Sequence, residues 1–577
     1  MSVRQFGRPE EPGVSILGVT VPDLSGNPGM SGSPDALGGP GLPAPSGAPG
    51  GPRPSGTPGL SGSSGAPGRP GPPDASGAPG SSRASDGPGS SGASGAPGLP
   101  GRSRSDACPG ALQTHAAADG GLARIRVPGG RLPSARLREL ARAAAECGTG
   151  VIELTSRANV QVRGLGEESG FAARMAEAGL LPSPTHERVR NILASPLAGC
   201  DGRGLLDAGP LVAELDRSLC ARPELAALPG RFLFAVDDGR GDVAGLGADA
   251  GILPLAPDLV AVLVAGADSG LRVPVSEAVP ALLAVAGAFL AELAGSGVAV
   301  WRIGELPGGS GRVVARVRAE VAGSAVTLAG ASAAARVETP AGASATAPVE
   351  TPAGTAAPLP ATDAGAGAEL GEPVAPHPAA RGPVGVIEPV RGHGDRKEDG
   401  DGGGDPGDRV ALGIAVPLGR LTAAQAELLA GLANEVRLTP WRGVVVPGLT
   451  RAEAAEAAVR LAGAGLVTDP DSPWTGVSAC TGRPGCAKSL ADVRADAASV
   501  IGLVEADAAS RSMRSPGTGT LPVHWAGCGR RCGRPAGRVV DVVATGDGYR
   551  VDADGLSLSC ADIGQTAAAV AAARGET

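Results

Sequence analysis

The sequence predicts an α+β protein of two pseudo-symmetric halves, and three observations support this prediction. First, the chain repeats itself, since residues 123–165 parallel residues 411–449. Second, each copy alternates short runs typical of strands with runs whose apolar residues recur at helical spacing. Third, each copy is followed by a further segment of mixed strand and helix character, at 185–320 and 470–577. We therefore expect a pseudo-twofold axis between the halves and a site at their interface, where pockets are common.

Each copy has the order strand, helix, strand, strand, helix, which is the βαββα order of a ferredoxin-like half-module. In the first copy, the run Leu122–Val127 predicts a strand, and the helix that follows carries apolar residues on one face until Gly148 stops it. In the second copy, two capping boxes are predicted at helix starts, Thr422 with Gln425 and Thr450 with Glu453. The matching positions include Val127 with Val416, Gly130 with Gly419, Leu132 with Leu421, and Thr155 with Thr439.

Composition separates globular from non-globular parts of the chain. Residues 1–106 are mostly Gly, Pro, Ser and Ala without the strict glycine period of collagen, and they bury too little apolar surface to offset the entropy of ordering. A Pro/Ala-rich stretch with a duplicated VETPAG and a charged run after it predict a linker. The predicted parts are a disordered tail at 1–106, a ferredoxin-like half-domain at 107–182, an α/β segment at 183–321, a flexible linker at 322–407, a second half-domain at 408–468 and a cysteine-bearing segment at 469–577.

Charge and hydropathy exclude several classes of function. The formal net charge is −8 at pH 7, whereas a nucleic-acid-binding domain normally presents a basic face, so no nucleic-acid partner is expected. The sequence shows neither an apolar stretch that reads as a membrane span nor a secretory signal, so no membrane partner is expected. Thiols suited to iron need a reducing compartment, which predicts a cytoplasmic location.

Four of the nine cysteines stand as two pairs in glycine-rich loops, Cys480-x5-Cys486 and Cys528-x3-Cys532. A [4Fe–4S] cluster needs four thiolates that converge on it, and glycines allow tight turns and close approach of N–H groups to sulfide. Structural zinc normally uses pairs that are two to four residues apart, which fits these loops poorly. Disulfides suit neither the odd number of cysteines nor a reducing compartment. The two pairs therefore predict an iron–sulfur cluster.

These motifs resemble those of the sulfite and nitrite reductase superfamily, whose cluster motif is C-x5-C…C-x3-C. Within it, the chain is most similar to the precorrin-3B synthase branch of the aerobic cobalamin pathway. The stretches that carry the resemblance are ACPGAL at 107–112, ADGGLARIRVPGGRL at 118–132, ELTSRANVQVRGL at 153–165, VRNILASPLAGCD at 189–201, LTPWRGVVVPGL at 438–449 and both cysteine loops. The resemblance implies that each half-module is followed by an α/β segment of the nitrite/sulfite reductase type.

The resemblance also implies an activity. We expect a monooxygenase that hydroxylates precorrin-3A at C20 with O2 and forms a γ-lactone, with electrons from a ferredoxin or an NAD(P)H reductase. Its expected cofactors are a [4Fe–4S] cluster and a second iron, held as siroheme or as mononuclear non-haem iron. The alternative is a ferredoxin-dependent sulfite or nitrite reductase with siroheme. A third class, a cluster-bearing carrier or scaffold, would need neither duplicated halves nor paired arginines.

Five residues of the first half are implied to bind tetrapyrrole or substrate. Arg157, Arg190 and Arg231 match basic positions around an anionic substrate, and Arg163 matches a contact to tetrapyrrole carboxylates. Asn159 lies on the same predicted strand edge. Guanidinium suits this role because it binds carboxylate bidentately and keeps its charge when desolvated. Taken without the resemblance, each arginine would be interpreted as a solvated surface residue.

The chain departs from the reductase pattern in two places. Where that pattern has two lysines, this chain has Arg231 and Leu233, and the lost cation disfavours reduction of a small oxyanion. Trp441 stands in the second copy where Arg157 stands in the first; an aromatic wall there suits a large flat macrocycle, and a core position is the alternative. His524, just before the second cysteine pair, is either a proton relay near the cluster or a packed histidine.

Overall fold

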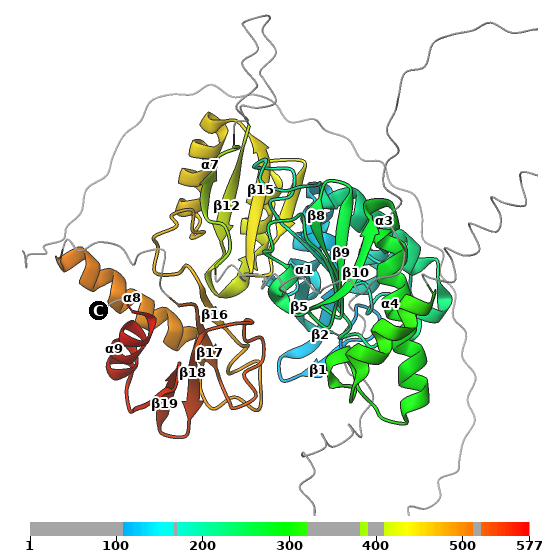
Figure 1. The fold of residues 1–577 in the computed structure, drawn as a ribbon. Helices are drawn as coiled ribbons and strands as arrows, with labels where there is room; N and C mark the ends of the chain where they lie inside the picture. The colour runs from blue at the N-terminus through cyan, green and yellow to red at the C-terminus, as the bar shows by residue number, and fades with distance from the viewer. Residues whose placement is uncertain (1–107, 167–169, 321–380, 391–408, 512–520, 576–577) are drawn as a thin grey trace, which may run out of the picture. The chain divides into compact units, whose positions relative to one another are not determined.

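The computed structural model describes residues 108–166, 170–320, 381–390, 409–511 and 521–575, all within one compact unit (Figure 1). The predicted disordered tail at 1–106 lies outside the described residues, and so does most of the predicted linker at 322–407. The described strands form four sheets of five strands each. Two of these sheets belong to the half-modules, and two belong to the segments that follow them.

The first half-module is an antiparallel sheet with a helix packed against it. In spatial order the sheet consists of β1 (His115–Ala117), β2 (Gly120–Ile125), β5 (Val160–Leu165), β4 (Val151–Leu154) and β13 (Arg420–Thr422). Helix α1 (Ser134–Cys147) packs on it with the predicted apolar face buried, and α2 (Phe171–Glu177) packs against α1. The first helix ends at the predicted Gly148, where a Cβ would come 2.7 Å from the carbonyl oxygen of Arg163.

The second half-module repeats this arrangement. In spatial order its sheet consists of β11 (Gly385–Ile387), β12 (Val410–Ala415), β15 (Gly443–Leu449), β14 (Glu435–Leu438) and β3 (Arg131–Pro133). Helices α6 (Ala423–Ala430) and α7 (Arg451–Gly463) begin at the two predicted capping boxes, and both reciprocal hydrogen bonds form in each. Strand β11 corrects the predicted linker boundary, because this part of 322–407 pairs with β12 as an edge strand.

The two half-modules exchange short strands. Strand β3 comes from the first copy but pairs with β14 of the second, so that Leu132 lies opposite Val436. Strand β13 makes the reciprocal pairing with β4, so that Leu421 lies opposite Ile152. Both leucines are fully buried in one core that the half-modules share. The predicted βαββα order missed these three-residue strands, which each precede the first helix of a copy.

The segments that follow the half-modules also share one topology. The first consists of β6 (Ile192–Ala194), β7 (Phe234–Val236), β8 (Ala250–Ala256), β9 (Leu259–Val264) and β10 (Ala267–Pro274). The second consists of β16 (Val477–Ala479), β17 (Val523–Ala526), β18 (Val540–Thr545), β19 (Gly548–Ala553) and β20 (Leu556–Cys560). In both, the first three strands are parallel and the last two are antiparallel. This equivalence confirms the predicted α+β fold of two pseudo-symmetric halves.

Helices pack on each of these sheets. Helices α3 (Ala208–Cys220) and α4 (Ala278–Ser296) pack on the first, and α8 (Val493–Arg511) and α9 (Ile563–Arg574) pack on the second (Figure 1). The expectation that no stretch reads as a membrane span is corrected in one respect, because among the described helices the one within Val275–Ser296 is long and apolar enough to cross a membrane by length and composition. It packs against β8 and β9 and buries nine residues there, as a core helix does.

Candidate functional site

The four paired cysteines lie in the loops that follow β16 and β17. These strands are parallel neighbours, with Ala479 opposite Trp525, so both loops leave the same edge of the sheet. The N–H of Cys480 donates to the carbonyl oxygen of Trp525 at 2.9 Å, and the N–H of Gly527 donates to the Cys480 sulfur at 3.2 Å. The backbone thus ties the two loops together at the first cysteine.

The four thiols of these loops influence one another electrostatically. The pKa of the Cys532 thiol is raised by desolvation and by the negative charges of Cys480, Cys528 and Cys486. Thiolates that act on one another in this way repel unless a cationic centre lies among them, which is the condition that a thiolate-ligated iron cluster meets. Glycine is needed beside them, because a Cβ on Gly527 would come 1.9 Å from the Ser489 hydroxyl oxygen. The donor set fits the predicted [4Fe–4S] cluster, whose ligands would be these four cysteines.

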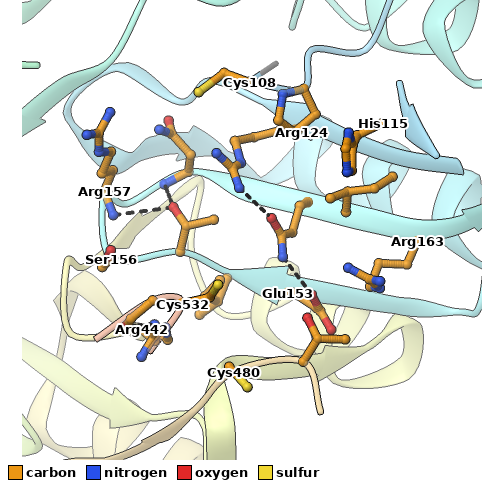
Figure 2. A pocket seen from close by; sticks show the side chains of 18 of the residues that line it. Cys108, His115, Arg124, Glu153, Ser156, Arg157, Arg163, Arg442, Cys480 and Cys532 are labelled. Atoms are coloured by element: carbon orange, nitrogen blue, oxygen red, sulfur yellow. Dashed lines mark hydrogen bonds between the residues drawn. The ribbon is translucent and has the colours of Figure 1, made fainter. Parts of the chain in front are cut away.

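A cavity of about 550 Å³ opens beside the cysteine loops, and both halves line it. This volume is within the range usual for cofactor and substrate sites. Figure 2 shows Arg124 and Arg157 of the first half on one side and Cys480 and Cys532 on the other. The charged and sulfur-bearing residues of its lining are Cys108, His115, Arg124, Glu153, Arg157, Arg163, Arg231, Arg442, Cys480, Arg494 and Cys532.

Two of the predicted binding residues present guanidinium groups to this cavity. Arg157 is half-buried, and desolvation, with the nearby Arg302 charge, lowers its pKa to about 10. Arg231 is exposed, and its guanidinium carbon lies 4.4 Å from the ring centroid of Trp301. A guanidinium stacked on an indole keeps its N–H edge available for a carboxylate. Both arginines therefore remain candidates for binding an anionic ligand.

Asn159 and Arg163 also line the cavity, but their side chains already have protein partners. The side-chain amide oxygen of Asn159 accepts the backbone N–H of Val127 at 2.8 Å, so Asn159 fixes the chain that leaves β2. Arg163 makes two bonds to Asp119, at 2.8 and 2.9 Å, and a third to the carbonyl oxygen of Gly485 at 2.8 Å. Arg163 thus connects β5 with the first cysteine loop.

Arg190 and Trp441 are not brought to this cavity. Arg190 is 4% exposed and makes two bonds to Asp216, at 2.6 and 2.7 Å, outside the cavity lining. The expectation that it faces the cavity is corrected, because the carboxylate on α3 takes up its guanidinium. Trp441 lines a separate cavity of about 50 Å³ with residues 381–384. It is therefore not the expected wall of the large cavity, where Trp301 supplies the aromatic face instead.

Several lining residues were missed by the sequence reasoning. Arg124 donates to the Gln161 side chain at 3.0 Å, and Glu153 bridges Gln161 at 2.7 Å to Arg494 at 2.6 Å. Arg124 stands on the alternating run of β2, so its position on the strand was a usable signal. Trp301 follows the apolar helix α4 and carried no periodic signal.

His524 is fully buried on β17, and Ser478 lies 3.0 Å from its Nδ1. Burial and the nearby Arg442 charge lower its pKa to about 3, so the ring is neutral. This packing agrees with the interpretation of His524 as a buried structural residue.

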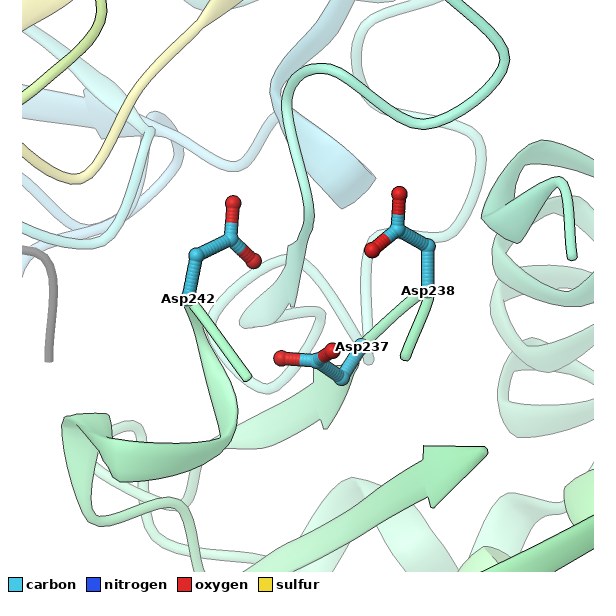
Figure 3. A group of neighbouring side chains, drawn as sticks. All are labelled: Asp237, Asp238 and Asp242. Carbon is cyan, nitrogen blue, oxygen red and sulfur yellow. The ribbon is translucent and has the colours of Figure 1, made fainter. Parts of the chain in front are cut away.

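The corresponding loop of the first half carries carboxylates in place of cysteines. Asp237, Asp238 and Asp242 gather after β7, with carboxylate oxygens within 4.8 Å of one another (Figure 3). Asp237 accepts four backbone N–H groups, including that of Gly239 at 2.9 Å. Asp238 binds Arg240 through both oxygens. Burial, with the neighbouring Asp237 charge, raises the pKa of Asp242 to about 7.

Comparison with known proteins agrees with this architecture. Residues 115–169 and 402–464 match the nitrite/sulfite reductase ferredoxin-like half domain, so the chain carries two copies of it. A precorrin-3B synthase of Sinorhizobium sp is 26% identical over 446 residues, which cover 76% of this chain and 80% of that protein. The ferredoxin–nitrite reductase of Synechococcus elongatus is 36% identical over 127 residues, or 21% of this chain and 25% of that protein. The chloroplastic enzyme of Zea mays is 33% identical over 160 residues, or 26% of each.

A solved structure has the same fold. The Mycobacterium tuberculosis NirA protein aligns with a TM-score of 0.51 and 20% identity over 76% of each chain. The alignments to the nitrite reductases named above span about a quarter of those proteins, whereas the alignment to the precorrin-3B synthase spans most of it. The resemblance that the motifs predicted is confirmed for the fold, for both half domains and for the synthase relative.

Proposed function

We propose that this protein is an oxygen-dependent oxidoreductase of the precorrin-3B synthase type. One observation carries the proposal: Cys480 and Cys532 of the cysteine loops line the same cavity as Arg157 and Arg231 of the other half. The synthase relative aligns over most of both chains, which favours this activity over the others. The proposed substrate is precorrin-3A, hydroxylated at C20 with closure of a γ-lactone.

The chain's own residues would bind and orient the substrate. Arg157 and Arg231 would hold its carboxylates by charge-assisted hydrogen bonds. Trp301 would pack its flat face against the macrocycle beside Arg231. Leu233, which stands where the reductase pattern has a cation, is 4% exposed and buried in the core. Position 233 therefore supplies no cation to the cavity.

The proposed reaction balances with one O2 per turnover. One oxygen atom forms the new C–O bond at C20, and the other leaves as water with two electrons and two protons. When bound, the [4Fe–4S] cluster would supply single electrons, and siroheme or a mononuclear iron would supply the site of oxygen activation. The proposed electron donor is a ferredoxin or an NAD(P)H-dependent reductase, in a reducing cytoplasm.

The second candidate is a ferredoxin-dependent sulfite or nitrite reductase with siroheme. The arginines that border the cavity, together with the matches to nitrite reductases, favour it. In this alternative the arginines would hold siroheme carboxylates rather than substrate carboxylates. The two activities differ in what they consume, so direct assays separate them.

The deciding experiment supplies anaerobically prepared full-length protein with precorrin-3A, a reductant and then O2. The expected product gains one oxygen atom by mass spectrometry, and the same protein should form little sulfide from sulfite or ammonia from nitrite. Arg157→Ala should lower the rate about ten- to hundredfold, since such contacts contribute about 1.5–3 kcal/mol. Arg272→Ala, which breaks an exposed ion pair with Asp268 outside the cavity lining, is the control and should keep the rate. Rapid sulfide or ammonia production without oxygen incorporation would support the reductase.

A further inference from the structure

Three arginines donate hydrogen bonds into the cysteine loops from three different elements. Arg163 on β5 donates to the carbonyl oxygen of Gly485 at 2.8 Å. Arg494 on α8 donates to the carbonyl oxygen of Cys480 at 3.2 Å. Arg442, in the turn between β14 and β15, donates to the carbonyl oxygen of Gly533. Each acceptor is a proposed cluster ligand or its direct neighbour, since Gly485 precedes Cys486 and Gly533 follows Cys532.

Two of these arginines carry their own counter-charges. Asp119 binds Arg163 through both oxygens, at 2.8 and 2.9 Å. Glu153 binds Arg494 at 2.6 Å, and Glu153 is only 5% exposed. Each pair has almost no net charge, so its main effect is to hold the loops in place rather than to change their electrostatic potential. Because Asp119 and Glu153 belong to the first half, these two pairs fix the cysteine loops against the opposite half.

Arg442 differs because no carboxylate among the described residues pairs with it directly. Among the described residues, no carboxylate forms an ion pair with Arg442, although it is only 9% exposed. Desolvation lowers its pKa to about 10, which leaves the guanidinium charged at neutral pH. The charges that favour its cationic form are Glu153 first and then the Cys480 thiolate, whereas Arg494 opposes it. A buried cation without a direct ion pair is costly unless anionic groups lie nearby, and a thiolate-ligated cluster would be such a group.

The backbone around Arg442 leaves room for it on both sides. A Cβ on Gly419 would come 2.7 Å from the Arg442 Cδ, and a Cβ on Gly533 would come 2.7 Å from its Nη2. Arg442 itself has φ of 57°, a left-handed conformation that is unfavourable for a residue with a side chain. The equivalent turn of the first half has the same conformation at Ala158, with φ of 52°. The long cationic side chain is therefore present only on the half that carries the cysteine pairs.

We propose that Arg163, Arg442 and Arg494 form a guanidinium clamp on the cysteine loops, with two separate roles. Arg163 and Arg494 hold the loops in the geometry that retains the cluster, and the charge of Arg442, which no direct ion pair binds among the described residues, raises the cluster's reduction potential. Adding an electron to the cluster increases its negative charge, so a nearby fixed cation favours the reduced state. The inference rests on the cluster of the proposed function, but not on its substrate or on its reaction with oxygen.

The test uses full-length protein reconstituted anaerobically with iron and sulfide, and a redox titration followed by electron paramagnetic resonance. Arg442→Gln should lower the potential by about 59 mV or more, which is a tenfold change in the reduced-to-oxidised ratio for one electron. Arg442→Lys keeps the charge and should stay close to the wild-type potential. A wild-type potential in Arg442→Gln, or an equal drop in Arg442→Lys, would overturn the electrostatic role.

The positional role has its own measurement. Arg163→Gln and Arg494→Gln should lose iron to a chelator about tenfold faster than wild type while the remaining cluster keeps its potential. Arg437→Gln is the matched control, since Arg437 donates to the carbonyl oxygens of Pro196 and Ala198 in the equivalent loop without paired cysteines. Unchanged iron loss in both variants would overturn the positional role. A wild-type protein that takes up no cluster would overturn the whole inference, whereas failed substrate turnover with a normal titration would overturn only the proposed activity.

Discussion

The two halves of this protein hold different chemistry on the same strand order. After β16 and β17, the second half carries two cysteine pairs, which point to a metal cluster. The equivalent loops of the first half, after β6 and β7, carry carboxylates instead, and Arg240 pairs with two of them, at 2.9 Å from Asp201 and 2.7 Å from Asp238. An internal guanidinium thus connects one pair of loops, whereas the other pair presents four thiols with the spacing of a cluster motif. The fold sets where the loops meet, and the loop residues set what they bind.

A second difference lies in the turns that face the cavities. In both halves a Thr N–H donates to the carbonyl oxygen four residues later, from Thr155 to Asn159 at 2.9 Å and from Thr439 to Gly443 at 3.0 Å. Arg157 of the first turn lines the cavity of about 550 Å³, whereas Trp441 of the second turn lines a cavity of about 50 Å³. A Cβ on Gly382 would come 2.9 Å from Trp441, so the chain before β11 closes this second cavity. The duplicated turns therefore line one large and one small cavity within the described residues.

The largest effect should come from removing the thiols that distinguish the loops of the second half from those of the first. Replacing Cys480, Cys486, Cys528 or Cys532 singly by Ser should abolish or damage the cluster, because [4Fe–4S] normally takes four thiolates. Iron and sulfide analysis should fall from about four of each per chain to well below that. Cys200→Ser is the matched control, since Cys200 lies in the equivalent first-half loop and should leave both contents unchanged. Full iron and sulfide in two of the four variants, or a zinc content of one per chain, would break the assignment.

A smaller effect is expected from the strands that the half-modules exchange. Leu132→Ala and Leu421→Ala should each lower the free energy of unfolding by about 2–5 kcal/mol, since both side chains are fully buried. Because Leu132 packs in the sheet of the second half, both variants should shift the same unfolding transition in denaturant. Leu556→Ala, which alters a side chain 42% exposed, is the control and should change little. Separate transitions, each shifted by only one variant, would show that the half-modules are energetically independent.

The sequence predicted the parts of the fold that depend on local patterns. The internal repeat gave the two half-modules, and the Thr-x-x-Gln and Thr-x-x-Glu patterns located both capped helices. The exchanged strands β3 and β13 were missed because three residues are too few to show an alternating pattern. Strand β11 was missed because its neighbours have the composition of a linker, and only its pairing with β12 orders it.

Site residues could be predicted only where a motif carried them. The cysteine loops and Arg157 were found from their spacing and resemblance, and they lie together around the cavity. Arg190 was misplaced because its partner Asp216 lies 26 residues away, and no pattern links the two. Trp301 and Arg442 were missed for a related reason, because only tertiary packing brings them to the cavity and no sequence pattern marks them.

The smallest effect should be the pH dependence of the carboxylate loop. Burial and the Asp237 charge raise the pKa of Asp242 to about 7, whereas the unfolded chain has an ordinary value near 4. The folded protein therefore holds an extra proton between these values, so this contribution to stability is present at low pH and is lost as pH rises to about 7. Asp242→Asn can still accept the Ser195 hydroxyl, which donates at 2.6 Å, but it cannot ionise. The variant should match wild type near pH 4 and have a higher melting temperature above pH 7.

Asp268→Asn is the opposite control. Arg272 lowers the pKa of Asp268, so Asp268→Asn should be less stable than wild type at pH 7. A melting temperature for Asp242→Asn below wild type at pH 8 would show that the ionised carboxylate stabilises the loop, and the acidic half would then need a cation besides Arg240.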